Sequence, residues 1–136
     1  MKLENNWRNK TIENLEKNKW SAIDFDSHLV KRTQELRKIP INTFTAEDLR
    51  IMIGQQIGLA YLIPLALEIL AEDLWTEANF YEGDLLNSVL KIDTKFWEDN
   101  KNYWLILHDL IKNSQDEIDQ NKFDVSGFYK CKHQFL

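Results

Sequence analysis

The sequence has few cysteines, glycines and prolines. Of its 136 residues only Cys131 is a cysteine, so no internal disulfide can form, and we expect the protein to work in a reducing compartment, the cytoplasm. Four glycines and two prolines are too few for a turn-rich β-sandwich or a disordered chain. Residues 1–20 contain no apolar run, so no secretory signal is predicted.

A long uninterrupted apolar run is also missing. The most apolar stretch, residues 51–71, is broken by polar side chains and helix breakers: Gly54, Gln55, Gln56, Gly58, Pro64 and Glu68. A membrane-spanning helix needs about 20 predominantly apolar residues. We therefore predict a pair of buried core helices here and no membrane partner.

Positive charge is absent from the middle of the chain. Residues 51–90 contain no Lys, Arg or His, although the net charge of the whole chain is only −5. The same stretch holds six acids: Glu68, Glu72, Asp73, Glu77, Glu82 and Asp84. A nucleic-acid binder needs a basic face, so direct nucleic-acid binding is not expected, and the charge suggests a basic partner or none.

What the sequence does contain is helical periodicity with capping residues. Thr45, followed by Glu47 and Asp48, predicts a helix start, because a hydroxyl and acids in the first turn satisfy free amides and the helix dipole. Apolar residues then recur at helical spacing from Leu49 to Ile57. Further helices are expected over 12–17, 28–38, 85–91 and 100–120, with one more turn after Asp93.

Several side chains are predicted to shape these helices and the segments between them. Thr11 and Ser27 are expected to cap the first two helices, Trp7 and Trp20 to flank the first, and Leu29, Thr33 and Leu36 to share the inner face of the second. Residues 71–84 are predicted to end a helix and form a loop that closes on Gly83, with Asp84 capping the next helix. The tail, 123–136, is expected to dock in extended form. The predicted fold is all-α: one irregular domain, residues 1–136, of about five to seven helices with a docked C-terminal tail.

No catalytic or metal-binding constellation stands out. Cys131 and His133 are one residue apart and lack a second pair of ligands, whereas zinc sites need four. His108 and Asp109 point in different directions around a helix. Glu68 and Glu72 are four residues apart, which fits a solvated acidic face, a partner-binding face or, as a weaker alternative, an unrecognised carboxylate site. We expect no enzyme activity, no catalytic residue, no metal, no cofactor and no small-molecule substrate.

The middle of the chain resembles a known family. It carries DLRIMIGQQIGL at 48–59, LIPLALE at 62–68, YEGDLL at 81–86 and FW at 96–97. The combined pattern, over roughly residues 40–97, is similar to immunity proteins of bacterial contact-dependent growth inhibition (CDI) systems. Members commonly have a proline after the tyrosine of the third motif, where this chain has Glu82.

The resemblance implies a definite function. Such proteins stay in the cytoplasm and neutralise the C-terminal toxin domain of a surface-displayed effector, the cognate partner. These toxins are often nucleases, including ones that cut tRNA, and neutralisation needs neither catalysis nor a cofactor. The alternative is a helical interaction or regulatory module with no toxin as its partner.

Residue roles follow from the resemblance and from side-chain chemistry together. The residues predicted to bind the partner are Glu72, Asp73, Trp75, Glu77, Tyr81 and Glu82, because acids provide steering and aromatics provide buried anchors. Core packing of Trp75 and Tyr81 is an equal alternative. A second possible surface contains Asp116, Glu117, Asp119 and Asp124.

The motif residues themselves are predicted to be structural: Asp48, Arg50, Gly54, Gly58, Pro64, Gly83 and Asp84. Arg50 is expected to pair with a carboxylate such as Asp84. Gly54 and Gly58, four apart, are expected to form one smooth face for close backbone approach, and Pro64 to kink a helix or start a new one.

Overall fold

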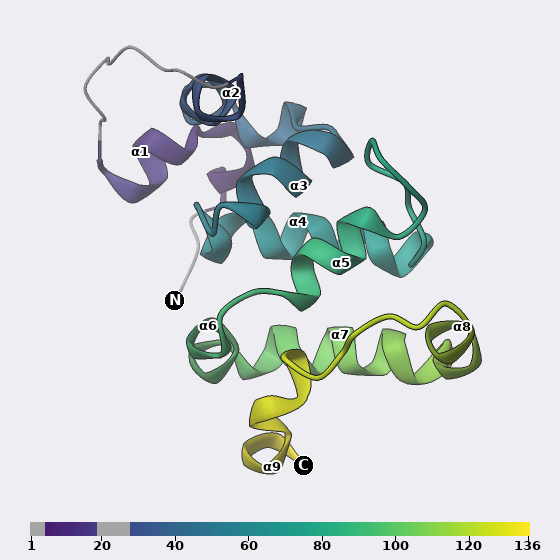
Figure 1. Cartoon of the computed structure of the whole chain (residues 1–136). Helices are drawn as coiled ribbons and strands as arrows, with labels where there is room; N and C mark the ends of the chain where they lie inside the picture. The colour runs from purple at the N-terminus through teal and green to yellow at the C-terminus, as the bar shows by residue number, and fades with distance from the viewer. Residues whose placement is uncertain (1–4, 19–27) are drawn as a thin grey trace.

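The computed structural model describes residues 5–18 and 28–136, and this part of the chain is helical (Figure 1). Its α-helices are α1 (Ile12–Glu16), α2 (His28–Leu36), α3 (Ala46–Gly54), α4 (Leu59–Glu72), α5 (Asp84–Leu90), α6 (Thr94–Asp99), α7 (Lys101–Asn113), α8 (Gln115–Gln120) and α9 (Lys132–Phe135). Three 3-10 helices join them: η1 (Trp7–Asn9), η2 (Ile41–Thr43) and η3 (Phe128–Cys131). Within the described ranges there is no sheet, only an isolated bridge between Thr11 and Pro40. The all-α fold class is confirmed, with more and shorter helices than expected.

Helix α3 lies at the centre of the upper part of the molecule. It packs against α5, α4 and α2, and α4 in turn lies on α7. Figure 1 shows α6 and α8 at the two ends of α7, and α9 below α6 and α7 at the bottom of the view. The buried side chains of these elements form one continuous hydrophobic cluster. None of the helices in the described residues is long and apolar enough to cross a membrane.

The predicted start of α3 is confirmed in detail. The Thr45 hydroxyl accepts a hydrogen bond from the Asp48 amide (3.1 Å), and the Asp48 carboxylate accepts one from the Thr45 amide (3.0 Å). This capping box satisfies two amides that a helix start leaves free. The predicted core helix pair over 51–71 is also confirmed as α3 and α4, and Pro64 lies inside α4, soon after its start at Leu59.

The expectation that Gly54 and Gly58 form one smooth face is wrong. Helix α3 ends at Gly54, so the two glycines do not share a helix. Gly58 precedes α4 with a left-handed φ of 65°, and a Cβ atom there would lie 2.6 Å from Cδ1 of Ile12. A Cβ atom at Gly54 would meet nothing within 4 Å. Only Gly58 is therefore required by its backbone conformation and by a close neighbour.

The N-terminal predictions are met in part. Thr11 caps α1, since its side chain accepts a hydrogen bond from the Asn14 amide. In α2, Thr33 and Leu36 are buried as expected, but Leu29 is 42% exposed. The predicted roles of Trp20 and Ser27 lie outside the described residues.

The single helix predicted over 100–120 is divided into α7 and α8. Ser114 between them leaves helical geometry (φ −123°, ψ 27°). Asn113 and Ser114 both favour helix ends, because their side chains compete for backbone hydrogen bonds. One face of the two helices still packs into the core, with Trp104, Leu107 and Ile111 buried in α7 and Ile118 buried in α8.

The tail docks as predicted, but residues 128–135 are helical and not extended. Phe128 is fully buried and stacks on Trp104, with ring centroids 5.0 Å apart and planes at 11°. The Trp104 indole donates a hydrogen bond to the Phe128 carbonyl (2.9 Å). Phe128, Cys131 and Phe135 are spaced three and four apart, a helical signal that the extended assignment missed.

We expect opposite results from alanine at the two glycines. Gly58→Ala should lower the free energy of unfolding by about 2 kcal/mol or more, because it combines a left-handed φ with a clash against Ile12. Gly54→Ala should be neutral or stabilise by about 0.5 kcal/mol, because alanine reduces the conformational entropy of the unfolded chain and meets no neighbour here. Urea denaturation of both variants measures this. Equal losses at both positions would contradict the difference described here.

Candidate functional site

The predicted partner-binding residues lie at the end of α4 and in the segment that follows it, residues 73–83, here called the 73–83 loop. Glu72, Asp73, Glu77, Tyr81 and Glu82 are all exposed. Trp75, the sixth predicted residue, is half-buried. The structure thus places the four acids and one of the two aromatic side chains on an accessible surface.

The carboxylate of Asp84 organises the loop. Its Oδ1 accepts a hydrogen bond from the Ala78 amide (2.6 Å), and its Oδ2 accepts from the amides of Asn79 (3.0 Å) and Phe80 (2.9 Å). Asp84 is only 3% exposed. Burial by itself raises the pKa of this carboxyl, but the amide hydrogen bonds outweigh burial, so its pKa lies below the usual value.

The expectation that Asp84 caps the helix after it is therefore wrong. Gly83 occupies the cap position with a φ of 89°, and Asp84 is the first residue of α5. Its side chain turns back toward the preceding loop because three convergent amides there bind an anion better than the helix start does.

A second contact holds the loop to the C-terminal part of the chain. Trp75 packs edge-on against Phe123, with ring centroids 4.9 Å apart. A Cβ atom at Gly83 would lie 2.5 Å from Cζ of Phe123 and 3.0 Å from Cε3 of Trp75. Of the two interpretations of Trp75, the structure thus favours packing, and Gly83 is required by the close approach of both rings.

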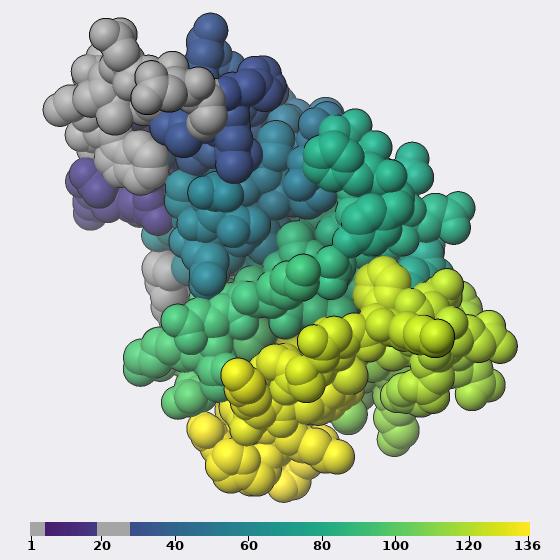
Figure 2. Space-filling view, in the orientation of Figure 1, coloured from purple at the N-terminus to yellow at the C-terminus, as the bar shows by residue number. Residues whose placement is uncertain are grey.

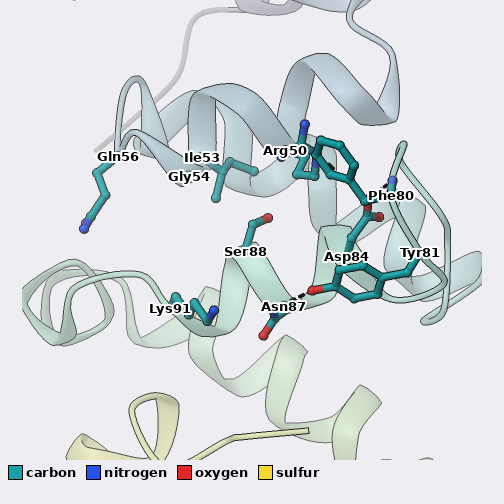
Figure 3. A pocket seen from close by; sticks show the side chains of 10 residues that line it. All are labelled: Arg50, Ile53, Gly54, Gln56, Phe80, Tyr81, Asp84, Asn87, Ser88 and Lys91. Atoms are coloured by element: carbon teal, nitrogen blue, oxygen red, sulfur yellow. Dashed lines mark hydrogen bonds and ion pairs between the residues drawn. The ribbon is translucent and has the colours of Figure 1, made fainter. Parts of the chain in front are cut away.

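A pocket of about 230 Å³ lies beside the loop. Figure 3 shows it between α3 and α5, with the loop closing one end. It is lined by Arg50, Ile53, Gly54, Gln56, Phe80, Tyr81, Asp84, Asn87, Ser88 and Lys91. It therefore shares Phe80 and Tyr81 with the loop and combines charged, polar and aromatic walls.

The predicted pairing of Arg50 with Asp84 is present but loose. Nε of Arg50 is 3.9 Å from Oδ2 of Asp84, which is an ion pair without a hydrogen bond. The guanidinium carbon also lies 4.6 Å from the centroid of the Phe80 ring (Figure 3). Arg50 thus joins α3 to the loop mainly by charge and by its contact with an aromatic face.

Phe80 is the residue that the sequence interpretation missed. Its side chain is 69% exposed, next to Tyr81 at 45%. The Tyr81 hydroxyl accepts a hydrogen bond from the Asn87 side chain (2.7 Å), which fixes its ring along the pocket. Exposed and oriented aromatic rings are typical of protein interfaces, and the adjacent Phe-Tyr pair in an acidic segment was the available signal.

The other candidates have structural explanations. Cys131 is buried, and burial raises the pKa of its thiol. His108 hydrogen-bonds the Tyr129 hydroxyl through Nδ1 (2.9 Å) and stacks on Trp104. Glu68 forms an exposed ion pair with Arg8. No group of three or more His, Cys, Asp or Glu side chains is placed to hold a metal within the described part of the chain.

The second acidic surface is also accessible. Asp116, Glu117, Asp119 and Asp124 are all exposed, on α8 and just after it. Asp124 accepts hydrogen bonds from the side chain and the amide of Ser126, and these lower the pKa of its carboxyl. No pair of exposed aromatic side chains adjoins these acids in the described residues, whereas the 73–83 loop has such a pair beside a pocket.

Asp84→Asn should destabilise the protein by about 2–4 kcal/mol at pH 7, because the amide group replaces one acceptor oxygen by a donor that faces the loop amides. The folded pKa of Asp84 is lowered, so its stabilisation is present above the unfolded pKa and is lost as pH falls through the folded value. The difference between variant and wild type should therefore shrink below about pH 4. Denaturant titrations at pH 7 and pH 3 test this.

The matched control is Asp93→Asn. Asp93 caps α6 by accepting a hydrogen bond from the Lys95 amide. Asparagine caps helices about as well as aspartate, so this change should cost less than about 0.5 kcal/mol. If both variants lose the same stability, the loop amides do not depend on the charge of Asp84.

Comparison with known proteins agrees with the resemblance seen in the sequence. Residues 11–107 match the family described as CDI immunity proteins. The matched range runs from the cap of α1 into α7 and contains the 73–83 loop and every residue of the pocket. No curated protein and no solved structure shows significant similarity to the chain. On the extent of the family match, most of the chain, this protein belongs to the CDI immunity proteins.

Proposed function

We propose that this protein binds and neutralises the toxin domain of its own CDI effector in the cytoplasm of the producing cell, and that the toxin is a nuclease, with tRNA a candidate substrate. Family membership supports the toxin as partner. The observation that carries the rest is a rigidly held, exposed acidic segment with Glu72, Asp73, Glu77 and Glu82 on its surface.

Charge supports a nuclease as the target. A nuclease holds phosphates, so its cleft is basic, and an acidic surface is attracted to that cleft and competes with nucleic acid for it. The segment with the exposed acids belongs to the stretch 51–90, which has no basic side chain to weaken this attraction.

The rigidity of the loop supports tight binding. Ordering a free loop on association costs affinity. Here the Asp84 carboxylate and the Trp75–Phe123 contact hold the loop in place before a partner arrives. Inhibition by occupying the toxin surface then needs no chemical step and no cofactor.

The decisive test is calorimetric titration with the toxin domain encoded immediately upstream of this gene, at low and high salt. Wild-type protein should bind with one-to-one stoichiometry and a dissociation constant of about 1 nM or tighter, and binding should weaken with salt. The triple variant Glu72→Lys, Glu77→Lys, Glu82→Lys should bind at least about tenfold more weakly, since it repels a basic cleft. Asp73 is left unchanged because its carboxylate accepts a hydrogen bond from the Trp75 amide.

A matched control reverses three other exposed acids, Asp109, Asp116 and Glu117. It changes the net charge equally and should leave affinity within about threefold. If only the control lost affinity, α8 would be the binding surface and the proposed face would be wrong. If the wild-type protein did not bind the toxin domain at all, the proposed function itself would be contradicted.

A further inference from the structure

Two cations line the pocket beside the 73–83 loop, at opposite ends of it. Arg50 and Lys91 immediately precede and follow the stretch 51–90, which has no basic residue of its own. The fold brings both to the pocket between α3 and α5 (Figure 3). The space-filling view in Figure 2 shows these helices and the loop at the surface, above the C-terminal segment coloured yellow. The pocket therefore places two cations next to the 73–83 loop, whose own charged side chains are all acidic.

One donor of Arg50 has no acceptor among the described residues. A guanidinium group has five N–H donors, yet Nε of Arg50 is buried without a hydrogen-bond partner. Asp84 is too far away at 3.9 Å, and its oxygens already accept the amides of Ala78, Asn79 and Phe80. Buried donors without acceptors are rare in folded proteins and call for an explanation.

The surroundings hold this guanidinium group ready for an acceptor. The Phe80 ring lies 4.6 Å from its central carbon, and the hydrogen bond between Asn87 and Tyr81 fixes another wall of the pocket. No side chain crowds Gly54 on the side of α3, where an added Cβ atom would be in open space. The pocket is thus preformed, partly open and about 230 Å³ in volume, which is ample room for one acidic side chain.

We propose that this pocket receives one acidic side chain of the toxin domain, whose carboxylate binds the Arg50 guanidinium while Lys91 lies at the entrance and Phe80 packs against the acid's aliphatic stem. Planar two-point pairing is what a guanidinium offers a carboxylate. The inference rests on the proposed toxin partner and adds a role for Arg50 beyond holding Asp84. At the loop, this protein supplies the acids and the toxin the basic groups, whereas at Arg50 the charges are the other way round. This one inverted pair fixes the orientation of the complex, because any other orientation brings like charges together.

The test compares Arg50→Gln with wild-type protein in binding to the same toxin domain. We expect the dissociation constant to rise about 30-fold, while the thermal midpoint shifts by no more than about 3 °C because the amide contacts of Asp84 hold the loop without Arg50. Arg8→Gln is the matched control, since Arg8 pairs with Glu68 on α4 and does not line the pocket. It should leave the dissociation constant unchanged.

A double-mutant cycle identifies the partner group. Each exposed Asp and Glu of the toxin domain is changed to Asn or Gln and titrated against wild-type protein and Arg50→Gln. One toxin substitution should weaken wild-type binding but have little further effect on Arg50→Gln. Lys91→Gln, at an exposed position, repeats the cycle without risk to the fold and should show a smaller coupling to the same toxin residue.

The outcomes separate the two proposals. Failure of the wild-type protein to bind toxin would contradict the proposed function. Wild-type binding with an unchanged Arg50→Gln would overturn the pocket inference alone. Loss of affinity with no coupled toxin acid would also overturn it.

Discussion

The surface that distinguishes this molecule depends on one buried negative charge. The Asp84 carboxylate gathers the amides of Ala78, Asn79 and Phe80, which would otherwise need solvent. Hydrogen bonds to an ionised acceptor are among the stronger ones in proteins, particularly when they are shielded from water. With those three amides fixed, the chain reverses direction, Phe80 and Tyr81 project outward, and the acids of the 73–83 loop stay in solvent. The pocket follows from the same geometry, because its loop wall lies where this carboxylate holds it.

Features determined by near neighbours in sequence were predictable. The capping box at Thr45 needs only four residues, and the inner faces of α3 and α7 follow from helical spacing. Features determined by tertiary contacts were not. The sequence spacing does not separate Gly54 from Gly58, because the difference lies in the left-handed φ of Gly58 and in the approach of Ile12. The direction of the Asp84 side chain was equally hidden, since an acid next to a helix start has an ordinary local use as a cap. The tail became helical in the presence of Trp97 and Trp104, which supply the surface that a short segment cannot supply for itself.

The sequence predicted the exposed acids of the candidate site but not its pocket. The charge of the acids between two apolar helices favoured exposure, and Glu72, Asp73, Glu77 and Glu82 are exposed, whereas Asp84 is buried. The aromatic side chains have different environments. Trp75 packs against Phe123, whereas Phe80, which the sequence analysis did not single out, is the most exposed large apolar side chain among the described residues. The cations that line the pocket were visible only as the two ends of a stretch without basic residues. Both line one pocket because α3 packs against α5, and this packing cannot be predicted from the spacing of residues in the sequence.

The contact of Phe123 with Trp75 and Gly83 has a consequence for modularity. Phe123 lies beyond residue 107, where the family match ends, yet it forms the floor under the loop. The 73–83 loop therefore cannot be transferred to another protein together with only α4 and α5. In a relative without an aromatic side chain at the position of Phe123, the transferred loop would lose the contact that Phe123 makes with Trp75 and Gly83. Diversification of the loop and of the chain after α8 is coupled, because a change of shape in one must be accommodated by the other.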